Sequence, residues 1–324
     1  EMVVVGAPSE ATPSTSKNTD AYFKTLKNYN AFAKANSSRK KVLYVGANNG
    51  ILHAFDANTG QELWGFVPPL LAGNLPLMIN TDLNRSKEGG SNAIYGVDGS
   101  PAVSNLFIQS PLRLAGSKQW RTILMIPYGR GGAGFSVLDV TDPDKPVHFY
   151  SIYNDKDNKK VHVLIARTNV KSYDYGSVPS EYDYTKLGQT WSSPRITRIP
   201  NSGAGDTVID DDLNVAIMGG GYDDTDEATG SNLTIVNLDN LGKINKVIPL
   251  NNITNNNITN SAPSTPLVLT PDTVGDSNIY RGALVYLNDL EGKITKFNLT
   301  NMEKDKDGNS IEMYDSTQIF SVDA

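Results

Sequence analysis

The sequence predicts an all-β protein with the architecture of a β-propeller. One pattern behind this prediction is a hairpin that occurs four times along the chain. Each copy has an apolar strand, a turn that contains glycine, and an alternating strand that ends in Asp or Asn. A second pattern is a Ser-Pro or Thr-Pro pair upstream of three of the hairpins. The hairpins lie at 41–56, 122–139, 215–239 and 283–298.

The Ser-Pro and Thr-Pro pairs mark where the first strand of a unit begins. Proline lacks a backbone N–H, so a sheet tolerates it best at the start of a strand or on an edge. The pairs are Ser100-Pro101, Ser193-Pro194 and Thr265-Pro266. The segment 2–8 fits a fourth first strand, and we expect the chain to be truncated at its N-terminus within this strand.

A short strand follows each hairpin, which gives each unit four strands. These outer strands are predicted at 62–66, 146–150, 246–250 and 318–322. Four-stranded sheets repeated around an axis make a β-propeller, and stacking between blades explains middle strands that are apolar on both faces. A β-sandwich is the alternative, but it does not explain four copies of one hairpin with the same lead-in.

The four units are predicted to form one propeller domain over residues 1–324. Four blades are rarely a complete ring and the chain stops at a strand, so we expect them to be part of a larger ring that is incomplete at the C-terminus. One short helical insertion is predicted at 20–35, where apolar residues recur at helical spacing behind Asp20 as the cap. Trp64, Trp120 and Trp191 fall at equivalent blade edges and predict packing between blades.

The composition excludes several classes of function. A net charge of −6 and a pI of about 5.2 argue against a nucleic-acid partner, which binds basic faces. The chain has no cysteine, which excludes disulfides, thiolate zinc sites, iron–sulfur clusters and cysteine nucleophiles. No stretch approaches the roughly 18 apolar residues that a membrane-spanning helix needs.

The sequence carries no motif of an enzyme active site. The glycine-rich run 129–134 lies between two predicted strands and opens no helix, so it does not match a nucleotide-binding loop. Neither a Gly-x-Ser-x-Gly turn nor a His-Glu-x-x-His helix occurs. His53 lies on a predicted strand beside Phe55 and is interpreted as a packed or hydrogen-bonded residue. We therefore expect a protein that is not an enzyme.

Acidic clusters offer the oxygen ligands that calcium prefers. Asp305, Asp307 and Asn309 alternate as in a calcium loop, but an Asp-Gly-Asn hairpin turn explains the same residues. A second cluster either holds a cation or points to solvent, because four acids in five residues repel one another. It consists of Asp223, Asp224, Asp226 and Glu227. The similar run 210–212 is more typical of a turn.

Four tyrosines are concentrated in one predicted loop between Ser172 and Leu187. Tyrosine combines a large contact area with a polar tip, and such loops are typical binding surfaces. The alternative is that the rings pin a long loop onto the propeller. The four residues are Tyr173, Tyr175, Tyr182 and Tyr184.

Longer motifs resemble those of one protein family. Residues 41–64 resemble the repeat of quinoprotein-type propellers, in which a hairpin ending in Asp precedes Ala-x-Thr-Gly and Trp. The segment 39–68 closely resembles the first blade of the PilY1/PilC family of type IV pilus biogenesis and tip-adhesin proteins. Motifs of the same family occur in order along the chain, at 95–101, 120–124, 129–135, 138–143, 187–194 and 289–297.

The resemblance implies a C-terminal propeller that lies downstream of an N-terminal half. It implies a non-enzymatic adhesin or assembly factor at the pilus tip or outer membrane, one that supports pilus extension and host-cell attachment. The implied partners are minor pilins, a host-cell receptor or matrix protein, and the N-terminal half. The alternatives are an outer-membrane assembly scaffold and a quinone-dependent dehydrogenase, and the absence of cysteine counts against the dehydrogenase.

The resemblance also implies a structural and regulatory calcium ion in an Asp-rich loop of the Asp289 blade. This loop offers Asp272, Asp276 and Asn278, but the positions of two further ligands hold Val274 and Tyr280. A polar turn between strands is the alternative interpretation. The loops at 272–278 and 305–309 are therefore two alternative calcium sites, and the Asp223 cluster is a third candidate.

Overall fold

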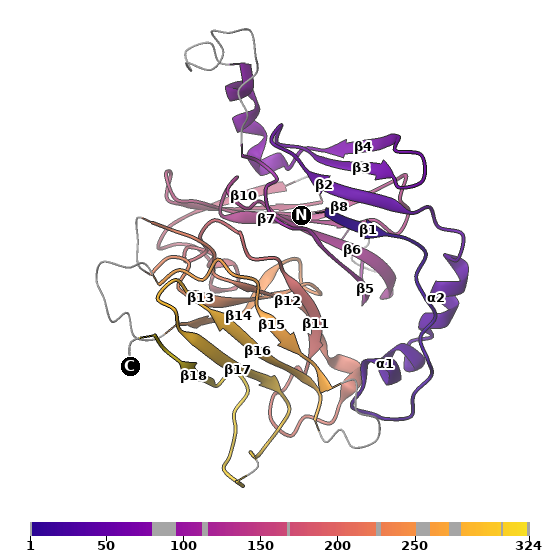
Figure 1. Ribbon diagram of the computed structural model, residues 1–324, viewed down its shortest axis with the longest axis vertical. Coiled ribbons are helices and arrows are strands. Elements are labelled where there is room, and N and C mark those ends of the chain that lie inside the picture. The colour runs from indigo at the N-terminus through magenta and orange to yellow at the C-terminus, as the bar shows by residue number, and fades with distance from the viewer. Residues whose placement is uncertain are drawn as a thin grey trace.

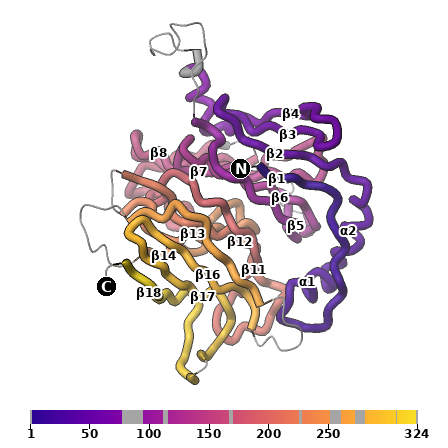
Figure 2. The backbone as a smooth tube through the Cα atoms, in the orientation of Figure 1, coloured from indigo at the N-terminus to yellow at the C-terminus, as the bar shows by residue number. Residues whose placement is uncertain are grey.

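The computed structural model describes residues 2–79, 95–111, 116–166, 169–224, 228–250, 260–271, 280–305 and 307–322. Four antiparallel sheets follow one another along the chain and lie side by side as an arc (Figures 1 and 2). We call these sheets blades 1 to 4. Within the described ranges, no helix is long and apolar enough to cross a membrane.

Each blade follows the predicted order of first, middle, alternating and outer strand. Blade 1 comprises β1 (Met2–Val5), β2 (Val42–Gly46), β3 (Leu52–Asp56) and β4 (Glu62–Phe66). Blade 3 comprises β11 (Arg195–Ile199), β12 (Leu213–Gly219), β13 (Asn232–Asn237) and β14 (Lys243–Pro249). Blade 4 comprises β15 (Leu267–Leu269), β16 (Gly282–Asn288), β17 (Ile294–Thr300) and β18 (Ser316–Phe320). The propeller prediction is confirmed, with four blades.

Blade 2 has two strands more than predicted, because an additional hairpin extends its outer edge. Its strands are β5 (Ala102–Ile108), β6 (Gln119–Pro127), β7 (Gly134–Asp139), β8 (Val147–Asp155), β9 (Lys160–Ile165) and β10 (Asn169–Asp174). The last two pair in register along their whole length, from Lys160 opposite Asp174 to Ile165 opposite Asn169. Short 3-10 helices complete the fold, at Pro69–Ile79, Ser180–Tyr182 and Ile209–Asp211.

The hydrophobic core lies between neighbouring blades. Strand β6 shows this, because Leu124 and Ile126 pack with blade 1 residues while Ile123 and Met125 pack with residues of blade 3. All four side chains are fully buried. Successive side chains of a strand point to opposite faces, so a strand that stacks between two blades must be apolar at every position. The interpretation of the middle strands is thereby confirmed for blade 2.

The helical insertion is two helices rather than the single helix predicted. α1 (Asp20–Leu26) and α2 (Tyr29–Ala35) are separated at Asn28, whose φ of 52° is left-handed and ends the first helix. Asp20 is not the cap: the hydroxyl of Thr19 accepts the backbone N–H of Tyr22. The pair lies beside the inner edges of the blades (Figure 1).

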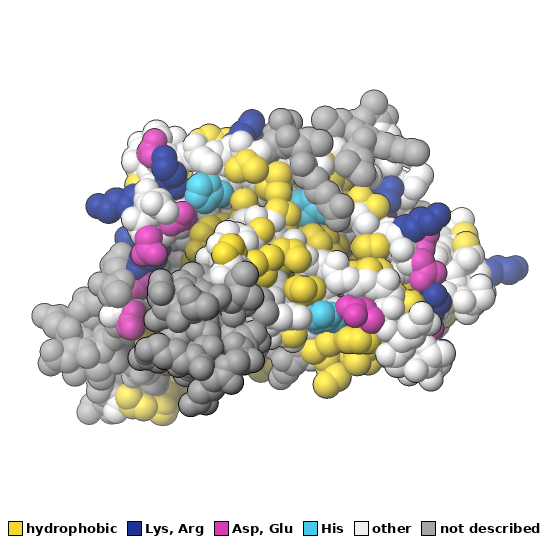
Figure 3. Space-filling view, turned by 90° about the horizontal axis from the view of Figure 1, so that it is seen from above, with side chains coloured by type: hydrophobic (Ala, Val, Ile, Leu, Met, Phe, Trp, Pro, Cys, Tyr) yellow, Lys and Arg dark blue, Asp and Glu magenta, His cyan; other side chains and the backbone are white. Residues whose placement is uncertain are grey.

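The outward face of each end blade carries exposed apolar side chains. In β1, Val5 is buried against blade 2, whereas Met2 and Val4 are 63% and 53% exposed. In β15 of blade 4, Leu267 and Leu269 are likewise exposed. Figure 3 shows hydrophobic side chains gathered in the middle of the face at the blade 1 end. Among the residues that the structure describes, no further sheet covers these two faces, whereas blades 2 and 3 each lie between two neighbouring sheets.

Candidate functional site

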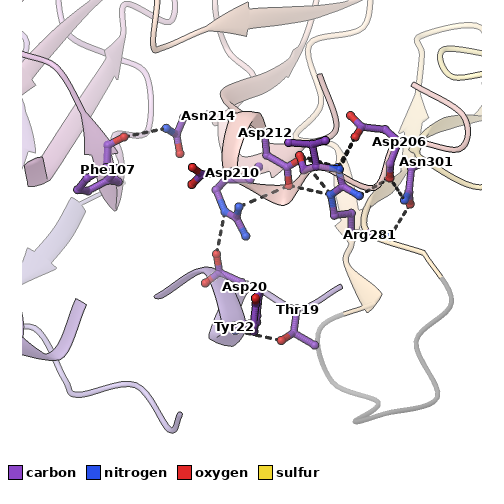
Figure 4. Close-up of polar contacts among 12 residues, drawn as sticks. Thr19, Asp20, Tyr22, Phe107, Asp206, Asp210, Asp212, Asn214, Arg281 and Asn301 are labelled. Atoms are coloured by element: carbon purple, nitrogen blue, oxygen red, sulfur yellow. Dashed lines mark hydrogen bonds and ion pairs between the residues drawn. The ribbon is translucent and has the colours of Figure 1, made fainter. Parts of the chain in front are cut away.

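Arg281 lies at the centre of a buried ion cluster between blades 3 and 4 (Figure 4). Its Nε lies 3.0 and 3.1 Å from the two carboxylate oxygens of Asp212, and its Nη2 lies 3.0 Å from Oδ1 of Asp206. The guanidinium also donates to the backbone carbonyls of Asp206 and Val208. Since Arg281 directly precedes β16, it ties the loop between β11 and β12 to blade 4.

Asn301 holds the same loop from the end of β17. Its Nδ2 donates to the carbonyl oxygen of Asp206 at 2.7 Å, and its Oδ1 accepts the backbone N–H of Arg281 at 2.7 Å. The backbone N–H of Gly205 donates to the carbonyl of Asn301. Both ends of the β16–β17 hairpin therefore contribute to the clasp, which we call the Arg281 clasp (Asp206, Asp212, Arg281 and Asn301).

Burial and the neighbouring charges shift the pKa values of the ionisable groups in the clasp. Burial raises the pKa of Asp206, but hydrogen bonds from the backbone of Ser202 and Val208 and from Arg281 outweigh it, so the pKa lies below 3.8. Burial raises the pKa of Asp212 more than the positive charges of Arg281 and Arg198 lower it, and the pKa rises to about 6. Burial lowers the pKa of Arg281, but the two carboxylates more than offset this and raise it. All three groups are therefore mainly ionised at neutral pH.

Arg198 extends the cluster from blade 3 to the helical insertion. Its Nε lies 3.1 Å from Oδ1 of Asp20, the first residue of α1, and its Nη1 lies 3.4 Å from Asp212. Its guanidinium also lies 3.7 Å from the centre of the Phe23 ring, a cation–π contact. The insertion, which belongs to blade 1 by sequence, is thus fixed to blade 3.

A cavity of about 400 Å³ lies beside the cluster. Strands β5 and β11, which contact each other at the inner edges of their blades, supply Ser104 and Arg198 to its wall. The Nδ2 of Asn214 donates to Asp239, which leaves the buried Oδ1 of Asn214 without a hydrogen-bond partner in the described part of the chain. The charged groups of this wall are paired with one another, which is typical of a structural interior.

A group of three carboxylates, Asp206, Asp211 and Asp212, lies close enough to hold a metal ion. The guanidinium of Arg281 already pairs with two of them, so a cation is supplied by the chain itself. The sequence pattern identified 210–212 as an acidic run but missed Asp206 and Arg281. No local signal could have linked them, because 69 residues separate Arg281 from Asp212.

The predicted calcium loop at 305–309 has the geometry of a hairpin turn. Oδ1 of Asp305 accepts the backbone N–H groups of Asp307 and Asn309, and Oδ2 accepts the side-chain amide of Asn309. Hydrogen bonds from Asn309 hold the pKa of Asp305 below its usual value. The carboxylate that would lead a calcium loop is thus engaged by the loop itself.

Of the other predicted calcium ligands, the structure describes only Asp223 and Asp224. Asp223 is nearly buried and forms an ion pair with Lys156, while Asp224 is exposed. Asp226 and Glu227 lie outside the described residues, as do Asp272, Asp276 and Asn278.

The four tyrosines predicted as a binding surface pack largely inward, which is a correction. Tyr182 and Tyr184 are 6% and 2% exposed in the core between blades 2 and 3, and the hydroxyl of Tyr184 donates to the carbonyl of Gly242. Tyr173 and Tyr175 are partly buried against the same core. Two of the rings therefore leave almost no area for a partner, because they fix the loop that follows β10.

The tryptophans are not equivalent, although equivalent roles were predicted. Trp64 of β4 donates to the carbonyl of Pro143 in blade 2, so it joins two blades as expected. Trp120 packs against Phe23 and Tyr29 of the helical insertion. Trp191 is 45% exposed, and its Nε1 donates to Oε1 of Gln189 in the same loop. His53 stacks on Phe55 and lies 2.6 Å from Glu62, in agreement with a hydrogen-bonded role.

Four successive antiparallel blades, of which the third and fourth are joined by a buried ion cluster, define the class of the protein as a β-propeller. The family model of the PilY1 beta-propeller domain matches residues 18–322. The chain therefore belongs to the PilY1 β-propeller family, and the predicted family is confirmed.

Known relatives agree with this assignment. The type IV pilus biogenesis factor PilY1 homolog of Xylella fastidiosa is 39% identical over 143 residues, which cover 44% of this chain and 10% of that protein. PilY1 of Pseudomonas aeruginosa PAO1 is 38% identical over 116 residues, or 36% of this chain and 9% of that protein. The crystal structure of the Pseudomonas aeruginosa PilY1 C-terminal domain matches with a TM-score of 0.57 and 25% identity, over 91% of this chain and 45% of that one. The matched regions are thus a small part of the curated relatives.

Proposed function

We propose that this propeller is the scaffold module of a type IV pilus biogenesis factor that also contributes to host-cell attachment. The observation that carries the proposal is the family match over residues 18–322, which includes all of blades 2 to 4. The relatives are named as pilus biogenesis factors rather than as enzymes. In this proposal the protein acts at the pilus tip or outer membrane, with minor pilins and a host surface component as partners.

The structure suggests how such a module works mechanically. The cores between blades, the Arg281 clasp and the Arg198 contact to α1 link every blade to its neighbour or to the insertion. Several contacts between buried or part-buried groups hold the arc as one body, which allows loops at its rim to keep fixed relative positions. A rigid carrier of exposed loops suits assembly and attachment.

Deletion of the propeller from the full-length protein in the source organism tests the proposed function. We expect fewer surface pili, measured by shearing the cells and quantifying pilin, and lower attachment to epithelial cells. Arg195→Met, at an exposed position of β11, is the matched control and should leave both unchanged. Normal piliation and attachment without the propeller would contradict the proposal.

We also propose that calcium binds the loop with Asp272, Asp276 and Asn278. Among the described carboxylates, those of the Arg281 clasp and Asp223 are paired with cations of the chain, and that of Asp305 is engaged by its own loop. Calorimetry with calcium, and chelator as control, should give binding that Asp272→Ala abolishes and Asp305→Ala retains. Equal binding by wild type and Asp272→Ala would refute this site.

A further inference from the structure

A pocket of about 460 Å³ opens among the loops at one rim of blades 2 to 4. Its volume lies within the roughly 300–1,000 Å³ of small-ligand pockets. The pocket shares no residue with the clasp, and of the predicted site residues only Asp224 contributes to it. We call it the rim pocket, and its lining residues are Arg130, Gln189, Trp191, Tyr222, Asp224 and Pro263.

The floor of the rim pocket is built by backbone hydrogen bonds between blades. Gln189 and Tyr222 exchange two such bonds, of 2.8 and 2.9 Å, and the N–H of Gly129 donates to the carbonyl of Thr190. Gly221 has a φ of 96°, and a Cβ atom there would lie 2.4 Å from the carbonyl oxygen of Gln189. Because this approach requires glycine, the backbones of the two loops lie in close contact at the floor of the pocket.

The rim pocket presents an aromatic surface, the indole of Trp191, whose ring N–H is already hydrogen-bonded. Trp191 is 45% exposed, and its Nε1 donates to Oε1 of Gln189 at 3.1 Å. Covering a large exposed aromatic ring removes apolar surface from water, which is favourable. An exposed indole in a pocket therefore favours a ligand with an apolar face. The ring of Tyr222 lies partly exposed in the same pocket.

Two opposite charges border this aromatic surface. The guanidinium of Arg130 lies 4.4 Å from the ring centre of Tyr95 and donates to the hydroxyl of that residue at 3.3 Å. Asp224 is exposed, and neither charge forms an ion pair with any residue that the structure describes. A carboxylate accepts hydrogen bonds only and a guanidinium donates only, so together they match a ligand whose groups do both.

We propose that the rim pocket binds a carbohydrate. A sugar ring has an apolar C–H face that can cover Trp191, and hydroxyl groups that both donate to Asp224 and accept from Arg130 and Gln189. A protein partner fits less well, because a stable protein interface needs roughly 800 Å² on each side and the pocket is small and concave. The proposal gives the adhesive part of the proposed function a ligand class.

Saturation-transfer NMR on the purified chain tests the carbohydrate site with three probes: maltotriose, chitotriose and sialyllactose. We expect saturable binding of at least one. A carboxylated probe that binds best would point to pairing with Arg130, and a neutral probe that binds best to stacking and hydroxyl recognition. Trp191→Ala should weaken the affinity about tenfold or more, and Asp224→Asn by a similar factor. Phe320→Ala, which removes an equally exposed ring on β18, should bind as wild type does.

Two results would overturn the carbohydrate site. One is the absence of saturable binding by all three probes at millimolar concentration. The other is undiminished binding by folded Trp191→Ala, with folding checked by circular dichroism. If Trp191→Ala instead abolished binding of a purified pilus protein, with no saccharide bound by wild type, the rim pocket would be a protein interface and the proposal wrong. The binding assay needs no pili. A negative result would therefore refute the carbohydrate site without affecting the proposed role of the propeller in piliation, which the deletion tests separately.

Discussion

Arg281 and Asp212 are 69 residues apart in sequence, yet Nε of the arginine lies 3.0 and 3.1 Å from both oxygens of the aspartate in a buried setting. The carboxylate of Asp206 and the backbone carbonyls of the same loop also accept hydrogen bonds from the guanidinium. The residues of the pair precede the middle strands of two consecutive blades. Their contact therefore fixes how blade 4 sits on blade 3.

Removal of this arginine is expected to destabilise the fold strongly. Arg281→Met leaves the buried carboxylate of Asp206 without its cation and leaves Asp212 with only its 3.4 Å contact to Arg198. Breaking a buried ion pair in this way costs about 3–5 kcal/mol. Urea unfolding at pH 7 measures the loss. Arg195→Met, at an exposed position of β11, is the control, because it removes a single 3.4 Å hydrogen bond to the carbonyl of Pro266 and should cost no more than about 1 kcal/mol. Equal midpoints for the two variants would show that the clasp adds nothing.

The clasp also predicts how stability changes in acid. Because the pKa of Asp206 in the folded state lies below 3.8, its ionised form stabilises the fold above that pH. This contribution is lost as the pH falls through the lowered folded pKa. The urea midpoint of wild type should therefore fall more steeply below about pH 4 than that of Asp206→Asn. Parallel curves for the two proteins would contradict this assignment.

Asp212 has the opposite effect on the pH dependence of stability, because its pKa in the folded state is about 6 and therefore lies above 3.8. The folded protein then binds a proton between about pH 6 and 4 that the unfolded chain does not, so its contribution to stability is lost as the pH rises through 6. Carbon-13 NMR of the aspartate carboxyls should show one titration near pH 6 that disappears in Asp212→Asn. A spectrum in which every carboxyl titrates below pH 5 would be inconsistent with this burial effect.

The break between α1 and α2 depends on the left-handed conformation of Asn28. Asparagine adopts this conformation more readily than other residues with a Cβ atom, whereas a β-branched residue is strained there. Asn28→Val should lower the free energy of unfolding by about 1–2 kcal/mol, and Asn28→Gly should leave it nearly unchanged. Thermal unfolding of the two variants measures the difference, and similar values for both would argue for an uninterrupted helix.

Because the blades stack closely, a substitution that leaves a cavity between two of them should lower the free energy of unfolding strongly. Leu124 is fully buried on the side of β6 that faces blade 1, so Leu124→Ala should cost about 2–5 kcal/mol. Leu269→Ala, at an exposed position of β15, should cost far less. Chemical denaturation of both variants provides the comparison. A small loss at Leu124 would mean that blades 1 and 2 do not pack as described.

The blades could be predicted because their signals are local. Alternation along single strands and repeated turns identified the four-stranded units, including the doubly apolar β6. The helix break at Asn28 was missed because the apolar spacing continues through it. The additional hairpin at 160–174 was not predicted, because tyrosine-rich segments are typical of loops. Val161, Val163 and Ile165 nevertheless alternate as in a strand.

The site could be predicted only in part, because its contacts join distant segments. The acidic run 210–212 was visible, but nothing near it in sequence indicates that Arg281 supplies its cation. The same holds for the rim pocket, whose Trp191 was assigned to blade packing by its position at a blade edge. Pairings across blades depend on how sheets stack, which no single strand encodes.

Hydrogen exchange at the backbone amides of Ser202 and Val208 tests most directly whether the Arg281 clasp holds blades 3 and 4 together. Both amides donate to the carboxylate of Asp206 in the loop that Arg281 secures. The account predicts slow exchange in wild type and in Arg195→Met, and much faster exchange in Arg281→Met under conditions where that variant remains folded. Equally slow exchange in Arg281→Met would contradict it.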